Sequence, residues 1–265
     1  MKARDGRIIA AEAETRALRA LRALWRFGWL PTRSIAALRA AWSRSSTGQP
    51  VLDAPVATAS DVRMAQRTLK RLANARQVLR GQAPDGSVIY ALSEAGARRL
   101  QQAGLPAVSG KDLIRTFSTA QFRHRTIANQ IGIGGMLNGF RVSTEREIAQ
   151  DRWLGGVDGI AGKKPDVLLR SEKQIFWIEV ERSRKNSRDY AKLLAWLTVV
   201  SDDAKCESKL LSDGLTWEKI IFVCTPVFRS KLTRDLVAMG WKKSSIDSLI
   251  TFSIELYRFE DILFA

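Results

Sequence analysis

Three acidic residues in the second half of the chain stand at a spacing that suits metal-assisted hydrolysis. Asp166 opens one short apolar run, and Glu179 and Glu181 lie two positions apart in the next. Side chains alternate across a strand, so the two glutamates share a face and repel each other unless a cation lies between them. Mg²⁺ prefers oxygen ligands, and a bound ion can activate water and stabilise the leaving oxygen of a phosphodiester. The candidate chemistry is phosphodiester hydrolysis.

Two predicted strands must position these carboxylates. The runs PDVLLR at 165–170 and QIFWIEVE at 174–181 are joined by a short turn, and a tight hairpin would bring Asp166 beside Glu179. The apolar residues that alternate with the glutamates would face the core. The alternative interpretation of the acidic face is an exposed surface whose carboxylates pair with nearby arginines.

Helices and strands alternate through residues 109–265. The expected order is a helix, three strands, a helix that Ser187 caps, and a buried strand in WEKIIFVCTP. This order predicts a mixed α/β sheet. The segment GIGG at 132–135 does not follow a strand, so we reject a dinucleotide- or phosphate-binding loop there. His124 is the only histidine, and we expect it on a helix surface or as a capping partner.

The net charge of +16 is unevenly distributed. Residues 1–100 contain 18 Lys+Arg against 7 Asp+Glu, which gives +11, and the remainder contains 25 against 20, which gives +5. Sixteen of the first 18 cations are arginines, whose planar, forked guanidinium suits phosphates and guanine edges. A basic half of this kind indicates an anionic partner, and we expect double-stranded DNA.

The first 108 residues predict three helices, a hairpin and a closing helix. Gly28 should end the first helix, Ser60 should cap the third, Asp85-Gly86 should form the hairpin turn and Ser93 should cap the last helix. The third helix has an apolar stripe of Val62, Ala65, Leu69 and Leu72. Its candidate DNA contacts are Arg63, Arg67, Lys70, Arg71 and Asn74.

This order of elements, which ends in VIYALSEAGARRL, resembles the winged-helix domain of bacterial regulators over residues 10–105. The resemblance implies that the third helix enters the major groove. It also implies that the wing, with Arg80 at its base, contacts the DNA backbone. A winged helix that binds another protein is the alternative.

The second predicted domain, residues 109–265, resembles the PD-(D/E)XK (restriction-endonuclease-like) nuclease superfamily in KKPD, in IEVE and in its element order. More narrowly, HRTIAN, STERE, KPDVLL and WIEVERSRKN, taken in that order, resemble the replication-relaxation and plasmid-mobilisation proteins of bacterial mobile elements. Those proteins place a winged helix before a nuclease-like domain. The resemblance implies that Asp166 and Glu179 bind metal and that Glu145, or else Glu147, is an upstream acidic residue.

The sequence departs from the superfamily pattern at Glu181, where a lysine is expected. Lys185 or Lys164 is a candidate to replace that lysine from another direction. Otherwise Glu181 is an additional metal ligand, or the chemistry is lost and only DNA binding remains. Candidate phosphate contacts near the start of the next helix are Arg182, Arg184, Lys185 and Arg188.

We therefore expect a DNA-binding protein of a plasmid or conjugative element, which acts in DNA transfer or replication without efficient cleavage. The alternatives are an active Mg²⁺- or Mn²⁺-dependent endonuclease or nickase, and a winged-helix transcriptional regulator. Without catalysis we expect no cofactor. The protein partners considered are a relaxase or another transfer protein, and a second copy of the chain.

The remaining expectations concern the compartment. No apolar run is long enough to span a bilayer, and charges interrupt the first residues where a signal peptide would be apolar. We therefore expect a cytoplasmic protein without a membrane partner. Cys206 and Cys224 lack a cluster of further zinc ligands and are expected to be reduced thiols.

Overall fold

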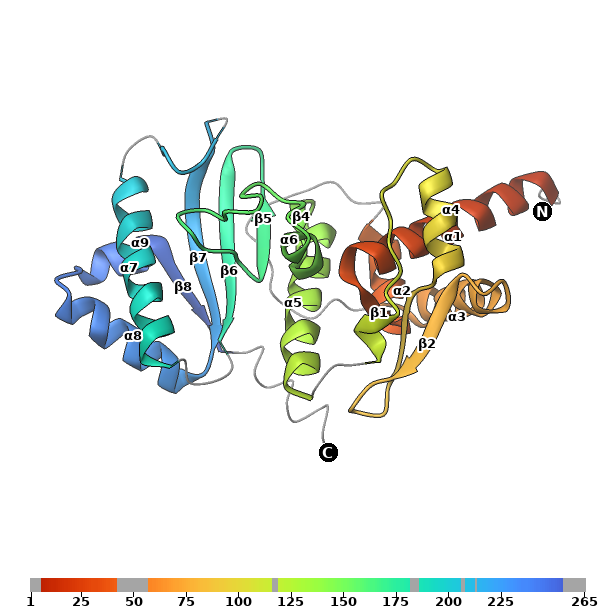
Figure 1. Cartoon of the computed structure of the whole chain (residues 1–265), viewed down its shortest axis with the longest axis horizontal. Coiled ribbons are helices and arrows are strands. Elements are labelled where there is room, and N and C mark those ends of the chain that lie inside the picture. Colours follow the sequence, from red (N-terminus) through yellow and green to blue (C-terminus); the bar gives the residue numbers. More distant parts are fainter. Residues whose placement is uncertain are drawn as a thin grey trace. The chain divides into compact units, whose positions relative to one another are not determined.

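The structure, a computed structural model, describes residues 6–41, 57–115, 119–181, 186–205, 208–212 and 214–254. These residues form a mixed α+β fold that packs as two compact units (Figure 1). One unit contains the described residues up to Arg123, and the other contains those from His124 onward. The predicted boundary at residue 108 lies after α4 (Glu94–Gln102), whereas the division between the units falls within α5 (Thr119–Leu137).

The first unit combines helices with a three-stranded antiparallel sheet. The strands lie in the order β1-β3-β2. Gly28 ends α1 with a φ of 86°, a backbone conformation that glycine adopts without a steric penalty. Besides α4 and the start of α5, the elements of the first unit are, in chain order, α1 (Gly6–Phe27), β1 (Trp29–Pro31), α2 (Thr32–Ala41), α3 (Ala59–Asn74), β2 (Val78–Gln82), β3 (Val88–Leu92) and the short 3-10 helix η1 (Asp112–Ile114).

The core of the first unit is built from helix faces whose apolar residues follow helical spacing. α1 buries Leu21 and Leu24, and α3 buries Leu69 and Leu72. Residues three positions apart lie on one face of a helix, so each pair points inward and leaves the opposite face in water. Val62 was expected in the same stripe but is only half-buried.

The turn of the β2–β3 hairpin forms where the sequence predicts it. Gly86 has a φ of 78°, and its N–H donates to the carbonyl of Ala83 at 2.9 Å. The side chain of Asp85 accepts the N–H of Ser87 at 3.0 Å, which fixes the turn from the other side. Ser93 caps α4, also as predicted.

Two predicted helix caps are wrong by one or two residues. The hydroxyl of Thr58 accepts the N–H of Asp61, so α3 begins at Ala59 and Ser60 lies inside its first turn. Likewise α7 (Ser187–Asp203) is capped by Asn186 and not by Ser187. Adjacent serine, threonine and asparagine residues all suit an N-cap, so the sequence does not decide among them.

The second unit is a five-stranded mixed sheet covered by helices. Its strands lie in the order β4-β5-β6-β7-β8, with β4, β5 and β6 antiparallel and β6, β7 and β8 parallel. Together with α5 and α7, its elements are β4 (Arg141–Ser143), α6 (Glu145–Ala149), β5 (Val167–Arg170), β6 (Gln174–Glu181), β7 (Thr216–Cys224), α8 (Pro226–Ala238), α9 (Lys243–Leu249) and β8 (Ile250–Ser253).

Helices cover both faces of this sheet. Ile127 and Ile131 of α5 pack on one face, against Phe176 and Ile178 of β6. The other face packs against α7, α8 and α9, and it contains Trp177 (Figure 1). Alternate residues of β6 therefore enter two separate apolar layers, which is why the strand is apolar along most of its length.

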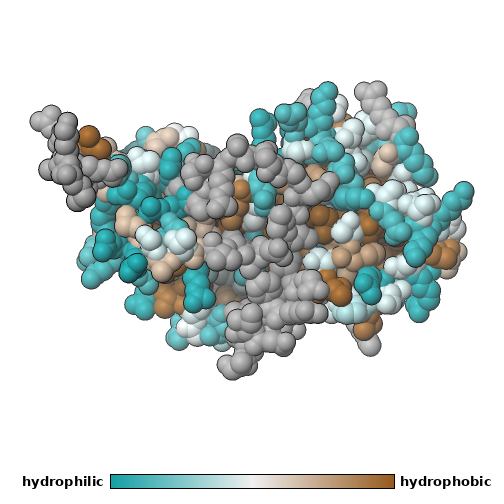
Figure 2. All heavy atoms as spheres, turned by 180° about the vertical axis from the view of Figure 1, so that it is seen from behind, coloured by the Kyte–Doolittle hydropathy of each residue, from teal (hydrophilic) through white to brown (hydrophobic). Residues whose placement is uncertain are grey.

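The described surface is largely hydrophilic. Figure 2 shows hydrophilic residues over much of one face, with apolar residues between them. Among the described residues, Val157 and Val227 are the most exposed large apolar side chains, at 71% and 74%. Among the helices that the structure describes, none is long and apolar enough to cross a membrane.

Candidate functional site

The β5–β6 hairpin places Asp166 and Glu179 side by side. Val167 pairs with Ile178 in the antiparallel register, so the residue before Val167 comes opposite the residue after Ile178. The N–H of Asp166 donates to the carbonyl of Ile178 at 3.0 Å, which extends the pairing beyond the strand. The hairpin that the sequence predicts therefore brings the two candidate carboxylates together.

Two polar groups hold the carboxylate of Asp166. The N–H of Val180 donates to Oδ2 at 2.7 Å, and Nε2 of His124 lies 3.0 Å from Oδ1. Burial acts to raise the pKa of Asp166, but the hydrogen bond and charge of His124, with Val180 and Lys163, outweigh it and hold the pKa below its ordinary value. His124 is thus a partner of Asp166 and not an isolated residue on a helix surface.

Glu179 is buried and also has two partners. Its side chain is 5% exposed, Nζ of Lys163 lies 2.6 Å from Oε2, and the indole N–H of Trp177 donates to Oε1 at 2.6 Å. Burial raises the pKa of Glu179 to about 7; the charges of Asp166 and Glu181 add to the increase, and Lys163 opposes it. The site therefore contains an ion pair inside an apolar environment.

Lys163 is held in place by aromatic rings and by a short backbone bridge. Its ammonium lies 5.9 Å from the ring centre of Trp177 and 5.6 Å from that of Trp196. The backbones of Ile160 and Lys163 exchange hydrogen bonds of 2.9 and 3.2 Å, and the indole N–H of Trp196 donates to the carbonyl of Ile160. This loop fixes the lysine above the sheet.

The lysine predicted from the KKPD segment is Lys164, the neighbour of Lys163. Lys164 forms an ion pair with Asp151, and its side chain is more exposed than that of Lys163. Neither Lys163 nor His124 is predicted from the sequence as a partner of the carboxylates. The two tryptophans that enclose Lys163 were the available signal, but they come from β6 and α7, and only the fold brings them to the loop.

Glu181 lies on the same buried face as Glu179. It is 5% exposed and pairs with Cys224 across the parallel β6–β7 register. Burial, with the charge of Glu181 next in size, raises the pKa of the Cys224 thiol to about 12. The alternative of an exposed acidic sheet face is wrong, because helices and loops cover this side of β6.

The upstream acidic residues have partners of their own. Glu145 pairs with Arg125 of α5 at 3.3 Å. Glu147 accepts the N–H of Thr144, whose hydroxyl accepts the N–H of Glu147, so this carboxylate belongs to the capping box of α6.

The described residues do not by themselves fit a Mg²⁺ or Mn²⁺ ion. Such an ion takes about six oxygen ligands, but no group of three or more His, Cys, Asp or Glu side chains in the described part of the chain could hold a metal. All four carboxylate oxygens of Asp166 and Glu179 already contact a protein group. Lys163 supplies the positive charge that the paired carboxylates require.

A second candidate surface lies on α3 of the first unit, opposite its buried stripe. The exposed candidates there are Arg63, Arg67, Lys70, Arg71 and Asn74. Within the described ranges, Arg63, Arg67 and Lys70 form no ion pair. Arg71 donates to the carbonyl of Ala13 in α1 and so connects two helices. Arg80 is exposed on β2.

The remaining candidates lie near the start of α7. Arg188 is exposed in its first turn. Arg182, Arg184 and Lys185 lie outside the described residues, and so does Cys206. The first turn also contains Asp189, whose N–H the Asn186 side chain accepts at 2.8 Å. Of the four candidate phosphate contacts at this helix start, the structure therefore describes Arg188 alone.

Comparison of the chain with protein-family models, with curated proteins and with solved structures finds no match.

Proposed function

We propose that the chain is a DNA-binding protein whose first unit contacts duplex DNA through α3. The observation that carries the proposal is the exposed face of α3, where Arg63, Arg67 and Lys70 have no acidic partner among the described residues. A helix has the dimensions of the major groove, and arginines on its outer face suit guanine edges and phosphates. A surface that only kept the protein in solution would not need three unpaired cations on one helix face.

The arrangement of the first unit supports its assignment as a winged helix. Three helices precede a β2–β3 hairpin, and the short β1 completes an antiparallel sheet with β3. In such a domain α3 is the recognition helix, and the hairpin, with exposed Arg80, is the wing. The proposal therefore assigns α3 to the groove and the hairpin to the backbone.

The second unit supports a PD-(D/E)XK-like assignment. Its core order is α5, three antiparallel strands, α7 and the parallel strand β7, and Asp166 and Glu179 occupy the two acidic positions of the motif. Glu181 stands where that motif has a lysine. Because the ammonium of Lys163 pairs with Glu179, we propose that this unit holds DNA without efficient cleavage.

The biological role follows from the sequence resemblance. We propose that the protein acts in the transfer or replication of a bacterial mobile element, together with a relaxase or another transfer protein. The ordered segments that resemble plasmid-mobilisation proteins support this role.

The test is DNA binding by an Arg63→Gln/Arg67→Gln variant, measured by the anisotropy of a short labelled duplex. We expect the affinity to fall by roughly tenfold or more, because each arginine contact contributes about 1–3 kcal/mol. The matched control is Lys242→Gln/Lys243→Gln, which removes the same charge from exposed residues at the start of α9. An equal loss in both variants would mean that only net charge matters and would count against α3.

A metal-dependent endonuclease or nickase is the second candidate, because the hairpin pairs Asp166 with Glu179 as that activity requires. The assay measures nicking or linearisation of a supercoiled plasmid in the presence of Mg²⁺ or Mn²⁺. The control protein is the Asp166→Ala/Glu179→Ala variant. Nicked or linear product from the unaltered protein alone would establish cleavage. Lys163→Ala and Lys185→Ala would then identify the lysine that acts. Intact plasmid in every lane, with DNA binding retained, supports the non-cleaving function.

A further inference from the structure

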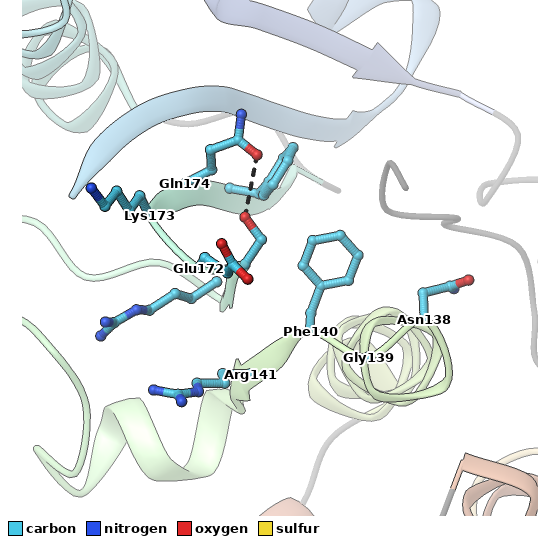
Figure 3. Close-up of a pocket in the computed structure, with 10 residues that line it drawn as sticks. Asn138, Gly139, Phe140, Arg141, Glu172, Lys173 and Gln174 are labelled. Atoms are coloured by element: carbon cyan, nitrogen blue, oxygen red, sulfur yellow. Dashed lines mark hydrogen bonds between the residues drawn. The ribbon is translucent and has the colours of Figure 1, made fainter. Parts of the chain in front are cut away.

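A hollow at the far end of the β5–β6 hairpin is separate from the acidic site. It has a volume of about 850 Å³, and its rim combines the C-terminal side of α5, the start of β4 and the turn between β5 and β6. Figure 3 shows Phe140 among the residues that line it, with Arg141 and Lys173 on the side away from Asn138. Hollows of this size hold ligands of nucleotide dimensions.

Two arginines face each other directly at this hollow. Arg141 and Arg170 are register partners in the antiparallel β4–β5 pair. Side chains at such positions leave the same face of the sheet with Cβ atoms about 5 Å apart, and like charges there destabilise the pairing. Neither arginine forms an ion pair within the described ranges, and Nε of Arg170 is shielded from solvent without a hydrogen-bond partner. An anion between them would remove the repulsion and satisfy that donor.

The rest of the lining keeps the hollow positive and well formed. Lys173 adds a third cation, and Glu172 is the only acidic residue among the described residues of the lining. The turn is fixed, because Ser171 N–H donates to the carbonyl of Gln174 and the N–H of Thr216 donates to that of Lys173. Phe140 and Phe176, whose ring centres lie 5.5 Å apart, belong to the apolar layer on the opposite face of the sheet from the two arginines and close the hollow from that side.

The end of α5 does not oppose an anion here. The N–H groups of Gly139 and Phe140 donate to carbonyls of its last turn, and the side-chain amide of Asn138 donates to the carbonyl of Gly134. These carbonyls are the negative end of the helix, and their hydrogen bonds reduce their effect on the hollow.

We propose that this hollow is a phosphate-binding site, with Arg141 and Arg170 as a two-pronged clamp, and that it takes a phosphate of a DNA strand. Arginine is suited to this because its forked donors bind phosphate oxygens in pairs. The choice of DNA as the source rests on the proposed function. Arg170 lies four residues along the strand from Asp166, or roughly 13 Å, and over this length of duplex axis one DNA strand has about four phosphates. One backbone segment could therefore follow the hairpin.

The first experiment tests phosphate itself and does not depend on DNA. The thermal midpoint is measured in sodium phosphate and in sodium chloride of equal ionic strength. The three proteins compared are the unaltered protein, Arg141→Gln/Arg170→Gln and the control Lys242→Gln/Lys243→Gln. We expect phosphate to raise the midpoint by about 2–4 °C for the first and third proteins and not for the second. In chloride the clamp variant should melt no lower than the unaltered protein, because its two like charges are gone. The same phosphate response in all three proteins, or none in any, would overturn the proposal.

The second experiment identifies the source of the phosphate. The probes are a labelled duplex and a deoxynucleoside monophosphate. If the phosphate belongs to a DNA strand, we expect the clamp variant to bind the duplex roughly tenfold more weakly than the unaltered protein. We also expect the monophosphate to stabilise the protein no more than inorganic phosphate does. Stronger stabilisation by the monophosphate, with unchanged duplex affinity, would overturn the DNA assignment.

If the Arg63→Gln/Arg67→Gln variant alone loses affinity, the clamp fails and the proposed function stands. If the unaltered protein binds no duplex, the proposed function fails and the phosphate result still decides the clamp.

Discussion

At the scale of single residues, the acidic site is governed by the ion pair between Lys163 and Glu179. The lysine is partly shielded by two tryptophan rings, and the glutamate is almost fully buried. Desolvation opposes the ionised glutamate more than the less buried lysine, and the lysine partly offsets that cost. Asp166, which is held by His124 and Val180, depends less on the lysine. The consequences of removing a charge therefore differ between the two carboxylates.

Replacing Lys163 by Met should destabilise the protein by roughly 3 kcal/mol near pH 8. The reason is that a buried carboxylate is left without its cation. The measurement is urea unfolding followed by circular dichroism. Lys164→Met is the control, because its pair with Asp151 is more exposed and should contribute less than about 1 kcal/mol. Equal losses for the two variants would contradict the assigned role of Lys163.

Glu179 should make the stability depend on pH with a definite sign. Its pKa is about 7 in the folded protein against an ordinary value of 4.5, so the folded state binds the proton more tightly. The resulting stabilisation, at most about 3 kcal/mol, is complete below about pH 4.5 and is lost as the pH rises through about 7. Asp166 has a lowered pKa and acts in the opposite sense, since its contribution is lost as the pH falls.

Glu179→Gln isolates this effect, because glutamine resembles the protonated side chain at every pH. The variant should match the unaltered protein near pH 4.5 and exceed its stability at pH 8. The free energy of unfolding of each protein, measured across this range, gives the difference directly. A difference that does not change with pH would show that Glu179 titrates as an ordinary carboxyl group.

At the scale of elements, the sequence predicts those strands and helices whose hydrophobic pattern is local to one segment of the chain. The strands β5, β6 and β7 are apolar runs of strand length between polar turns, and a hairpin register alone places Asp166 beside Glu179. The helices α6 and α9 have five and seven residues, too few for a periodic pattern to separate them from loops. The position of Lys163 depends on a tryptophan of α7, a contact that no local pattern encodes.

The loop that carries Lys163 needs glycine at position 159. Gly159 has a φ of +73°, and a Cβ there would lie 2.4 Å from the carbonyl oxygen of Lys163. Gly159→Ala should therefore displace the bridge between Ile160 and Lys163 and reduce stability by more than the roughly 1–2 kcal/mol expected from backbone strain alone. Gly156→Ala controls for the strain, because its φ is also positive and its Cβ would meet nothing within 4 Å.

The measurement is again the free energy of unfolding, taken at pH 4.5 and pH 8. We expect Gly159→Ala to lose more at the higher pH, where displaced Lys163 no longer compensates ionised Glu179. Gly156→Ala should lose the same amount at both values. If the two alanine variants behave alike, the loop does not position the lysine.

At the scale of the whole molecule, charge is spread over both units but concentrated in the first. Residues 1–100 carry +11 of the net +16. The proposed contacts nevertheless lie in both units, with Arg63 and Arg67 on α3 and Arg141 and Arg170 at the hollow. Total charge governs how the protein approaches DNA, whereas only groups that contact phosphates release counterions on binding.

The salt dependence of DNA affinity should therefore separate contacting cations from distant ones. Each phosphate contact contributes about 0.9 to the slope of log K against log salt concentration. Arg141→Gln/Arg170→Gln should lower the slope by roughly 2. Arg63→Gln/Arg67→Gln should lower it by the same amount if both arginines bind phosphate, and by less if they bind base edges. Lys242→Gln/Lys243→Gln should shift the affinity slightly and leave the slope unchanged. Anisotropy titrations over a series of salt concentrations measure all four slopes. A slope that falls equally in all three variants would show that DNA responds to net charge alone and would contradict both proposed contact surfaces.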